Sequence, residues 1–356
     1  VSGAGVNGEG AIVENTGDPA FHSPGGANLA YVTLAGDTTF GGTGRLDFRS
    51  NPSSGTNAAF YTGGQPYKIT LVGTNQIQFT GVQIDPALGD IDVREGTLGI
   101  ETSTTLGNSA SNLFVHAGSR LLFYQLYTPV EKQVHLSGDG TNDTIYAQSS
   151  QNAGQNILAG PIDITGNCLI NVASGYDLTF SNIVSGTGGL TLTAAGTLHL
   201  TGMAANTWSG GLTINAGTLQ IGDGQADGSI PATAITNNGA LVFNSANDMV
   251  VADEISGTGT LEQDGPGKLT LTGTDTFTGA TTVTGGILQV DGSTIGNGDL
   301  TVSGGTLAGS GTLLGNVSIQ AGGTLAPGDS IGTLNIIGSL TLAGTNEMQL
   351  SKSGST

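Results

Sequence analysis

Two short acidic segments carry the residue types of a calcium site. Asp139 and Asp143 fall in the run from 138 to 145, among glycine, threonine and asparagine, and Asp223 and Asp227 flank a glycine turn. Calcium takes about six to eight oxygen ligands, and each segment supplies two carboxylates plus main-chain carbonyls. Neither segment recurs in a stacked series, which a β-roll site needs. Two interpretations stay open: a calcium site, or an ordinary turn in which Asp accepts main-chain hydrogen bonds.

A third acidic segment has the residues that a polysaccharide lyase or hydrolase would use. It contains Asp85, Asp90, Asp92, Arg94 and Glu95. Asp90, Asp92 and Arg94 would point the same way along a strand, because side chains alternate between its two faces. Such an enzyme needs carboxylates that converge on one groove. The alternative is a solvated face with local ion pairs. We expect that the chain is not an enzyme and, calcium apart, that it has no cofactor.

Aromatic and basic residues are concentrated in the first half of the chain. Residues 1–180 hold 15 of the 18 Phe, Tyr and Trp residues and six of the eight Lys and Arg residues. Aromatic side chains supply a large contact area at low entropic cost. Two segments, Arg49–Lys68 and Arg120–Tyr127, are therefore predicted to carry recognition. The predicted binding residues are Arg49, Phe60, Tyr61, Tyr67, Lys68, Arg120, Tyr124 and Tyr127.

Each of these two segments also has a structural interpretation. The aromatics of Arg49–Lys68 could stack on sugar rings or pack against a partner, or Phe60 and Tyr61 could fill the atypical end that a solenoid requires. The run from Arg120 to Tyr127 reads as a strand with apolar residues on both faces. Either a neighbouring loop covers its outer face or that face is an exposed contact patch.

The elements that would position these residues follow from an internal repeat. Leu269-Thr270-Leu271-Thr272-Gly273 repeats the run from Leu198 to Gly202, and the run from Gly286 to Val290 repeats that from Gly217 to Ile221 at a slightly smaller offset. The offset shrinks because the first copy holds two extra residues between Met203 and Thr207, which predicts a loop there. Fixed apolar positions around a tolerated insertion are typical of a solenoid.

A shorter period gives the size of one coil. Gly-Gly pairs precede strand-like runs at 285, 304 and 322, at nearly equal steps. These steps are too short for a strand–helix–strand unit of about 30 residues. Between the glycines, leucine and β-branched residues alternate with Thr and Ser, as in a half-buried strand. The sequence predicts an all-β fold, a parallel β-helix with coils of roughly 18–25 residues that forms an elongated rod.

Two segments carry a family resemblance. LTLTGTDTFTGATTV, from Leu269 to Val283, is similar to the autotransporter-associated β-strand repeat, and the run from Gly323 to Leu334 resembles the segment that follows it in passenger domains. The resemblance covers about residues 180–345. It implies a right-handed β-helix displayed on, or released from, a Gram-negative-type cell, and it implies no catalytic residues. The translocator barrel that such a protein carries is missing, so we expect a fragment or a processed passenger.

Composition limits the partners. Eight Lys and Arg against 27 Asp and Glu leave a net charge of −19, which repels nucleic acid. No stretch approaches the roughly 18 apolar residues of a membrane span, so membrane insertion of this segment is not expected. The one cysteine, Cys168, is expected to be a buried thiol.

The function that the sequence predicts is that of an extracellular, structural or adhesive rod on the outer surface of a Gram-negative-type bacterium. Its partner would be a host or community cell-surface glycan or protein. Residues 1–180 form an N-terminal β-helix part with a cap and irregular loops for recognition, and residues 181–356 form regular β-helix repeats that act as a spacer. The alternative is a filament subunit that self-associates through the unpaired strand edges at the β-helix ends.

Overall fold

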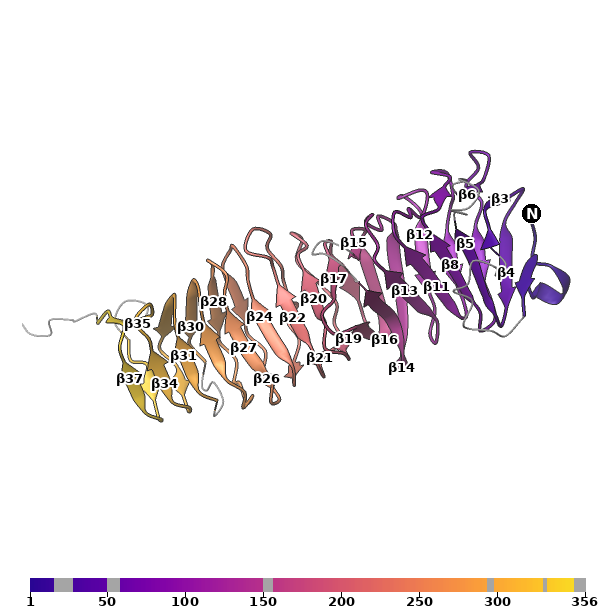
Figure 1. Cartoon of the computed structure of the whole chain (residues 1–356). Helices are drawn as coiled ribbons and strands as arrows, with labels where there is room; N and C mark the ends of the chain where they lie inside the picture. Colours follow the sequence, from indigo (N-terminus) through magenta and orange to yellow (C-terminus); the bar gives the residue numbers. More distant parts are fainter. Residues whose placement is uncertain (16–27, 50–57, 150–155, 293–297, 329–331, 349–356) are drawn as a thin grey trace, which may run out of the picture. The chain divides into compact units, whose positions relative to one another are not determined.

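The regular secondary structure of the described residues consists almost entirely of parallel β-strands. The computed structural model describes residues 1–15, 28–49, 58–149, 156–292, 298–328 and 332–348, which form two compact units, Val1–Thr197 and Leu198–Thr356. In the described part of the chain the one helical element is a single 3₁₀ turn, η1 (Val6–Gly8). The predicted all-β parallel solenoid is confirmed, with strands stacked coil on coil inside each unit (Figure 1).

Unit 1 has strands on two sides of its coils and, in some coils, on a third side. The first ladder contains β1 (Ile12–Glu14), β4 (Thr38–Gly42), β7 (Ile69–Leu71), β10 (Ile91–Val93), β12 (Asn112–Val115), β14 (Gln133–Ser149), β16 (Ile162–Val172) and β18 (Val184–Gly186). The second contains β2 (Asn28–Leu29), β5 (Arg45–Arg49), β8 (Gln76–Thr80), β11 (Thr97–Glu101), β13 (Arg120–Tyr124), the second halves of β14 and β16, and β19 (Gly189–Leu192). The third contains β3 (Tyr31–Thr33), β6 (Ala59–Tyr61) and β9 (Gln83–Ile84), and further along β15 (Ile157–Leu158) pairs with β17 (Asp177–Phe180).

Coil length varies in unit 1. Ile69, Ile91 and Leu113 stack on one another at equal steps, and these steps lie within the predicted range. The step from Thr38 to its partner Ile69 is longer than predicted. Part of this long coil, residues 50–57, belongs to the predicted Arg49–Lys68 segment and lies outside the described residues.

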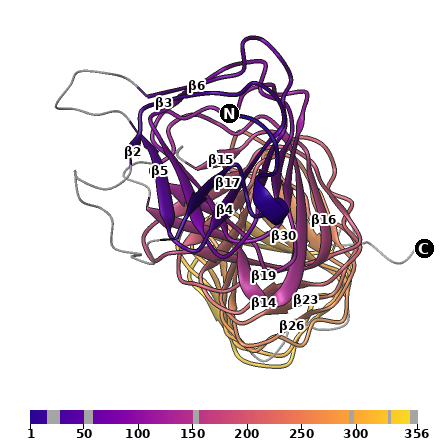
Figure 2. The same cartoon turned by 90° about the vertical axis from the view of Figure 1, so that its right-hand side faces the viewer.

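The interior of the first coils is aromatic. Phe40, Phe48, Phe60 and Phe79 are fully buried, and their ring centroids lie 5.1 to 6.1 Å apart in edge-on or tilted contacts. Such pairs add to the hydrophobic gain from burial. In the end-on view of unit 1, β3 and β6 run along the top and β5 lies on the left (Figure 2). Phe60 therefore fills the core, whereas its neighbour Tyr61 is exposed.

Unit 2 repeats the same plan with shorter strands. One ladder contains β21 (Leu212–Ile214), β23 (Ile235–Asn237) and β26 (Ile255–Ser256). A second contains β22 (Thr218–Ile221), β24 (Ala240–Phe243), β27 (Thr260–Gln263), β29 (Thr281–Val283), β31 (Leu300–Val302), β34 (Val317–Ile319) and β37 (Leu340–Leu342). A third contains β25 (Met249–Val251), β28 (Lys268–Leu271), β30 (Ile287–Val290), β32 (Thr306–Gly309), β35 (Thr324–Pro327) and β38 (Thr345–Asn346). In addition, β33 (Thr312–Leu313) pairs with β36 (Asn335–Ile336). The division of the chain into two units falls within β20 (Thr197–Leu200).

The short sequence period of unit 2 is the coil. Leu288 pairs with Leu307 and Leu307 with Leu325, so each Gly-Gly step of the sequence advances the chain by one coil. The Gly-Gly pairs make the turns before these strands: Gly305 has a φ of +68°, and a Cβ there would lie 2.6 Å from the carbonyl oxygen of Gly286 in the preceding coil. The five residues predicted to share one apolar interior are all buried: Leu269, Leu271, Val283, Leu288 and Val290.

The long repeat does not span a whole number of coils. Leu219 pairs with Leu241, Leu241 with Leu261, and Leu261 with Thr281, so Thr281 lies three coils beyond Leu219 on the same side. The copy of Leu219 in the repeat, Leu288, follows Thr281 on the next strand of that coil. Equivalent residues of the two copies therefore occupy different sides of the solenoid. The predicted loop of the first copy is present, and Met203 in it is 87% exposed.

Candidate functional site

The outer face of the second ladder of unit 1 carries aligned rows of polar side chains. Parallel register places Arg45, Gln76, Thr97 and Arg120 in one row, Asp47, Gln78, Gly99 and Leu122 in the next, and Arg49, Thr80, Glu101 and Tyr124 in a third. The residues between these rows, such as Leu46 and Phe48, point into the core. Alternation along each strand therefore turns all three rows outward.

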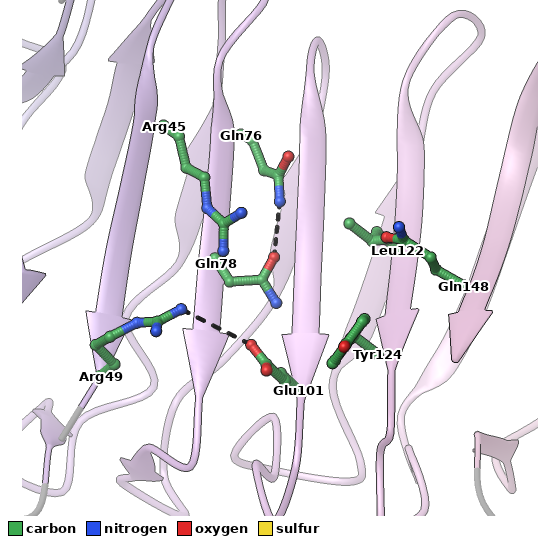
Figure 3. Close-up of a pocket in the computed structure, with 8 residues that line it drawn as sticks. All are labelled: Arg45, Arg49, Gln76, Gln78, Glu101, Leu122, Tyr124 and Gln148. Carbon is green, nitrogen blue, oxygen red and sulfur yellow. Dashed lines mark hydrogen bonds and ion pairs between the residues drawn. The ribbon is translucent and has the colours of Figure 1, made fainter. Parts of the chain in front are cut away.

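These rows enclose a groove of about 310 Å³, which we call the Arg–Gln groove. It is lined by Arg45, Arg49, Gln76, Gln78, Glu101, Leu122, Tyr124 and Gln148 (Figure 3). Its volume lies at the lower end of the roughly 300–1,000 Å³ range of small-ligand sites. Gln148 joins the groove through a register shift: Phe123 pairs with Ala147 but Tyr124 with Ser149, so Gln148 has no directly opposite residue. Irregularities of this kind re-aim side chains.

A glycine makes room for one of the side chains that line the groove. Gly99 stands in the middle row beside Gln78, and a Cβ at this position would lie 1.8 Å from the Gln78 side-chain oxygen. The Gln78 amide therefore lies over the strand where another residue would have a side chain. Its oxygen accepts a hydrogen bond of 2.8 Å from the Gln76 amide nitrogen (Figure 3). Gln78 is buried although it faces outward, and this burial restricts the conformations of its side chain.

Charges in the groove are balanced. Asp47, buried under the rim, pairs with Arg45 Nε at 2.7 Å and with an Arg49 terminal nitrogen at 3.0 Å. Arg49 also lies 3.9 Å from Glu101, whose carboxylate accepts a 2.6 Å hydrogen bond from Thr80. Two guanidinium groups thus face two carboxylates. Of the described lining residues only Glu101 is acidic, so the described lining does not offer the carboxylate pair of a glycosidase.

The predicted binding residues lie in different places. Arg49 and Tyr124 come together in the groove, and Leu122 of the predicted patch forms part of its wall. Arg120 faces Asp143 instead, with 3.8 Å between their charged groups, and lies over the Tyr146 ring. The remaining predicted residues do not line the groove: Phe60 is buried, Tyr61 and Tyr127 are exposed, Tyr67 is partly exposed, and Lys68 binds Asp92.

The candidate catalytic segment forms an ion-pair cluster. Asp92 is buried and contacts Lys68 Nζ at 2.7 Å, His116 Nε2 at 2.8 Å and Arg94 Nε at 3.0 Å. Burial alone would raise the pKa of Asp92, but the hydrogen bonds from Lys68, His116 and Arg94 lower it overall. An ionised, fully engaged carboxylate is a poor general acid. The geometry agrees with the local ion pairing that the sequence left open.

Asp85 and Asp90 accept hydrogen bonds from main-chain N–H groups of their own and neighbouring coils. The main-chain N–H groups of Ala87, Thr62 and Gly64 donate to Asp85 and hold its pKa at about 2. Asp90 accepts hydrogen bonds from the main chain and side chain of Asn112.

The four candidate calcium ligands also accept hydrogen bonds. Asp139 accepts from the main chain of Asn142 and Thr141, which lowers its pKa. Asp223 accepts from Ala226 and Gln225 in the same way. Asp143 accepts from the Asn171 amide, and Asp227 from Ser245 and Asn247. Asp139 and Asp223 are thus engaged as the turn interpretation requires, whereas the partners of Asp143 and Asp227 lie in the following coil. Within the described ranges, no three His, Cys, Asp or Glu residues are grouped closely enough to hold a metal ion.

Sequence reasoning missed a buried lysine. Lys132 Nζ donates to the carbonyl oxygens of Asn108 at 2.7 Å and Gly89 at 2.8 Å, and so links turns of three successive coils. Burial lowers the pKa of Lys132 to about 8, and the charge of Asp90 opposes this shift. A lone lysine between polar neighbours gives no sign of such a contact. The groove residues Arg45, Gln76, Gln78, Glu101 and Gln148 were missed too, because they align only through coils of unequal length.

The fold and its repeats define a class of protein, a parallel β-solenoid. Residues 190–221 and 261–290 match the family described as passenger-associated-transport-repeat. These two segments are the two copies of the long repeat. The chain is also 40% identical over 136 residues to the adhesin BmaC autotransporter of Brucella suis biovar 1 (strain 1330). Over these segments the chain is therefore similar to the repeats of autotransporter passengers, as its sequence predicts.

That similarity covers part of each protein. It involves 33% of this chain and 4% of the length of the Brucella relative. No solved structure matches the chain. Among the described residues, no helix is long and apolar enough to cross a membrane.

Proposed function

We propose that this chain is an adhesive part of a bacterial surface protein, displayed outside a Gram-negative-type cell, and that the Arg–Gln groove is its recognition surface. The proposal is carried by one observation: the outward rows of β5, β8, β11 and β13 enclose a polar groove with an exposed tyrosine at its edge. The passenger-type repeats and the adhesin relative support surface display and adhesion. Unit 2, whose described rungs are regular, serves as a spacer.

Adhesion to intact cells tests this proposal without knowledge of the ligand. The purified chain, coupled to beads, is measured for attachment to epithelial monolayers and to bacterial cells. Tyr124→Ala removes the aromatic edge of the groove and is expected to reduce attachment, while Tyr127→Ala, which removes an exposed tyrosine outside the groove, is not. Val250→Ser alters an exposed residue of unit 2 and serves as the spacer control. Loss of attachment in Val250→Ser with full attachment in Tyr124→Ala would contradict the assignment.

End-to-end self-association is a second proposal, favoured by the last described coil of unit 2. Leu340 and Leu342 of β37 are exposed, whereas their partners in the preceding coil, Val317 and Ile319, are buried. A further coil would cover these apolar side chains, and the proposal is that a second copy of this chain supplies that coil. Sedimentation of the chain over a wide concentration range, beside a Leu340→Ser/Leu342→Ser variant, tests this. A monomer at all concentrations would refute it.

A further inference from the structure

We propose that the Arg–Gln groove binds an uncharged oligosaccharide. This inference rests on the proposed recognition role of the groove and adds the chemical class of the ligand. Three properties of the described lining carry it: balanced charge, a fully paired main chain beneath it, and an apolar ring beside planar polar groups.

Charge balance argues against an anionic ligand. Both arginines already face carboxylates, since Arg45 and Arg49 pair with Asp47 at 2.7 and 3.0 Å. A sulfated or sialylated glycan would have to share these guanidinium groups with Asp47, a buried carboxylate that repels a second anion. The chain as a whole carries a net charge of −19, which repels anions at long range. A ligand without charge avoids both costs.

The paired main chain argues against an extended peptide. A peptide strand adds to a sheet through an unpaired edge. The strands under the groove are bonded on both sides, β8 between β5 and β11, and β13 between β11 and β14. Recognition there must use side chains alone. Only Leu122 and Tyr124 of the lining are apolar, too few for the buried centre of a protein interface.

The lining has the mixture of groups that a sugar ring needs. Hydroxyl groups both donate and accept, and Gln78, Glu101 and Arg49 present planar acceptors and donors at the floor and rim of the groove (Figure 3). The Tyr124 ring offers a flat apolar surface for the C–H face of a sugar.

The groove has the extent of a chain of sugars rather than of a single ring. Its lining runs across β5, β8, β11, β13 and β14. Four steps between adjacent strands at roughly 4.8 Å each give about 19 Å. The oligosaccharide would lie across the strands, because the polar rows run in that direction.

The test measures binding of the full chain to immobilised glycans. The neutral probes are cellohexaose, maltohexaose, xylohexaose and lacto-N-neotetraose, the anionic probes are sialyllactose and a heparin hexasaccharide, and denatured collagen is the protein probe. Two variants alter the groove. Tyr124→Ala removes the stacking surface. Gly99→Ala displaces the Gln78 amide from its place over the strand without backbone strain, since the Gly99 φ lies outside the left-handed region.

Each variant has a matched control. Tyr127→Ala controls for the loss of an exposed tyrosine, and Gly211→Ala for a glycine substitution, because a Cβ at Gly211 would meet no atom within 4 Å. We expect at least one neutral probe to bind, about tenfold weaker binding in each groove variant, unchanged binding in the controls, and little effect of salt.

The outcomes separate this inference from the proposed function. Binding of anionic probes only, weakened by salt and by Tyr124→Ala, would overturn the neutral ligand and leave the groove as the recognition surface. Binding of the protein probe alone, with the same sensitivity, would overturn the sugar. Absence of binding to all four neutral probes would also overturn it. If a neutral glycan binds all variants equally, the groove itself is not the site, and the proposed function fails with it.

Discussion

Two equivalent positions of the long repeat differ by one ionisable group. Asn206 and Asp275 both precede the core aromatic of their copy by two residues, Trp208 in the first and Phe277 in the second. Both are buried. The Asn206 amide donates a 2.7 Å hydrogen bond to the Ser229 carbonyl, and an Asp275 carboxylate oxygen accepts a 2.9 Å hydrogen bond from the main-chain N–H of Ile255. The fold thus accepts an amide or a carboxyl at this site, but only the carboxyl makes the stability of the surrounding coils depend on pH.

Burial raises the pKa of Asp275 to about 6 from 3.8, and although the Ile255 hydrogen bond opposes this, the charge of Glu254 adds to it. The folded state then holds a proton more tightly than the unfolded state. This stabilisation is present below about pH 4 and is lost as pH rises through 6. At about 1.36 kcal/mol per pKa unit, the ionised carboxyl destabilises the surrounding coils by about 3 kcal/mol at neutral pH.

Asp275→Asn removes the ionisation and keeps an oxygen that accepts from Ile255. We expect the variant to gain about 3 kcal/mol of local opening free energy at pH 7.5 and almost nothing at pH 4. Amide hydrogen exchange around Ile255, corrected for the intrinsic pH dependence of exchange, measures this quantity for each coil. Asp264→Asn, which removes an exposed carboxylate, controls for net charge.

The reciprocal variant Asn206→Asp places a buried carboxyl in the first copy of the repeat. Its coil should therefore lose stability as pH rises, as the Asp275 coil of the wild type does. Parallel pH dependence of wild type and Asp275→Asn between pH 4 and pH 7.5 would refute the reasoning. So would a gain of similar size in Asp264→Asn.

Four other predictions concern buried or engaged groups. Lys132→Met should lower the free energy of unfolding, measured in urea, by about 2–4 kcal/mol, because it leaves the carbonyl oxygens of Gly89 and Asn108 without their donor. An unchanged urea midpoint would contradict this. Burial raises the pKa of Cys168 to about 11, so a thiol reagent at pH 8 should react at the rate of local unfolding, and immediate labelling of the native chain would disprove its burial. Neither pectin nor alginate should release products, and reproducible release abolished by Asp92→Asn in a folded protein would overturn this expectation. Calcium chelation should leave the melting temperature unchanged, because Asp139 and Asp223 already accept main-chain hydrogen bonds, and a clear decrease would establish a calcium site.

The candidate site could be predicted only in part. The concentration of aromatic and basic residues pointed to Arg49 and Tyr124, which do meet in the groove. It could not separate Tyr124 from Phe60, which is also aromatic but points into the core from β6. Gly99, one of many glycines in this sequence, has no distinguishing sequence signal although it makes room for the Gln78 amide. These distinctions depend on which face of which strand a residue occupies.

The sequence by itself determined the solenoid, because alternating apolar residues and glycine turns act within the length of a single coil and recur from coil to coil. Leu269, Leu288 and Leu307 stack as their spacing predicts. Only the tertiary structure decided what lies beside what across coils. Register accumulates the length of every intervening loop, so a long step aligns Arg45 with Gln76 and a much shorter one aligns Gln76 with Thr97. For the same reason, the two copies of the long repeat place Leu219 and Leu288 on different sides of the coil.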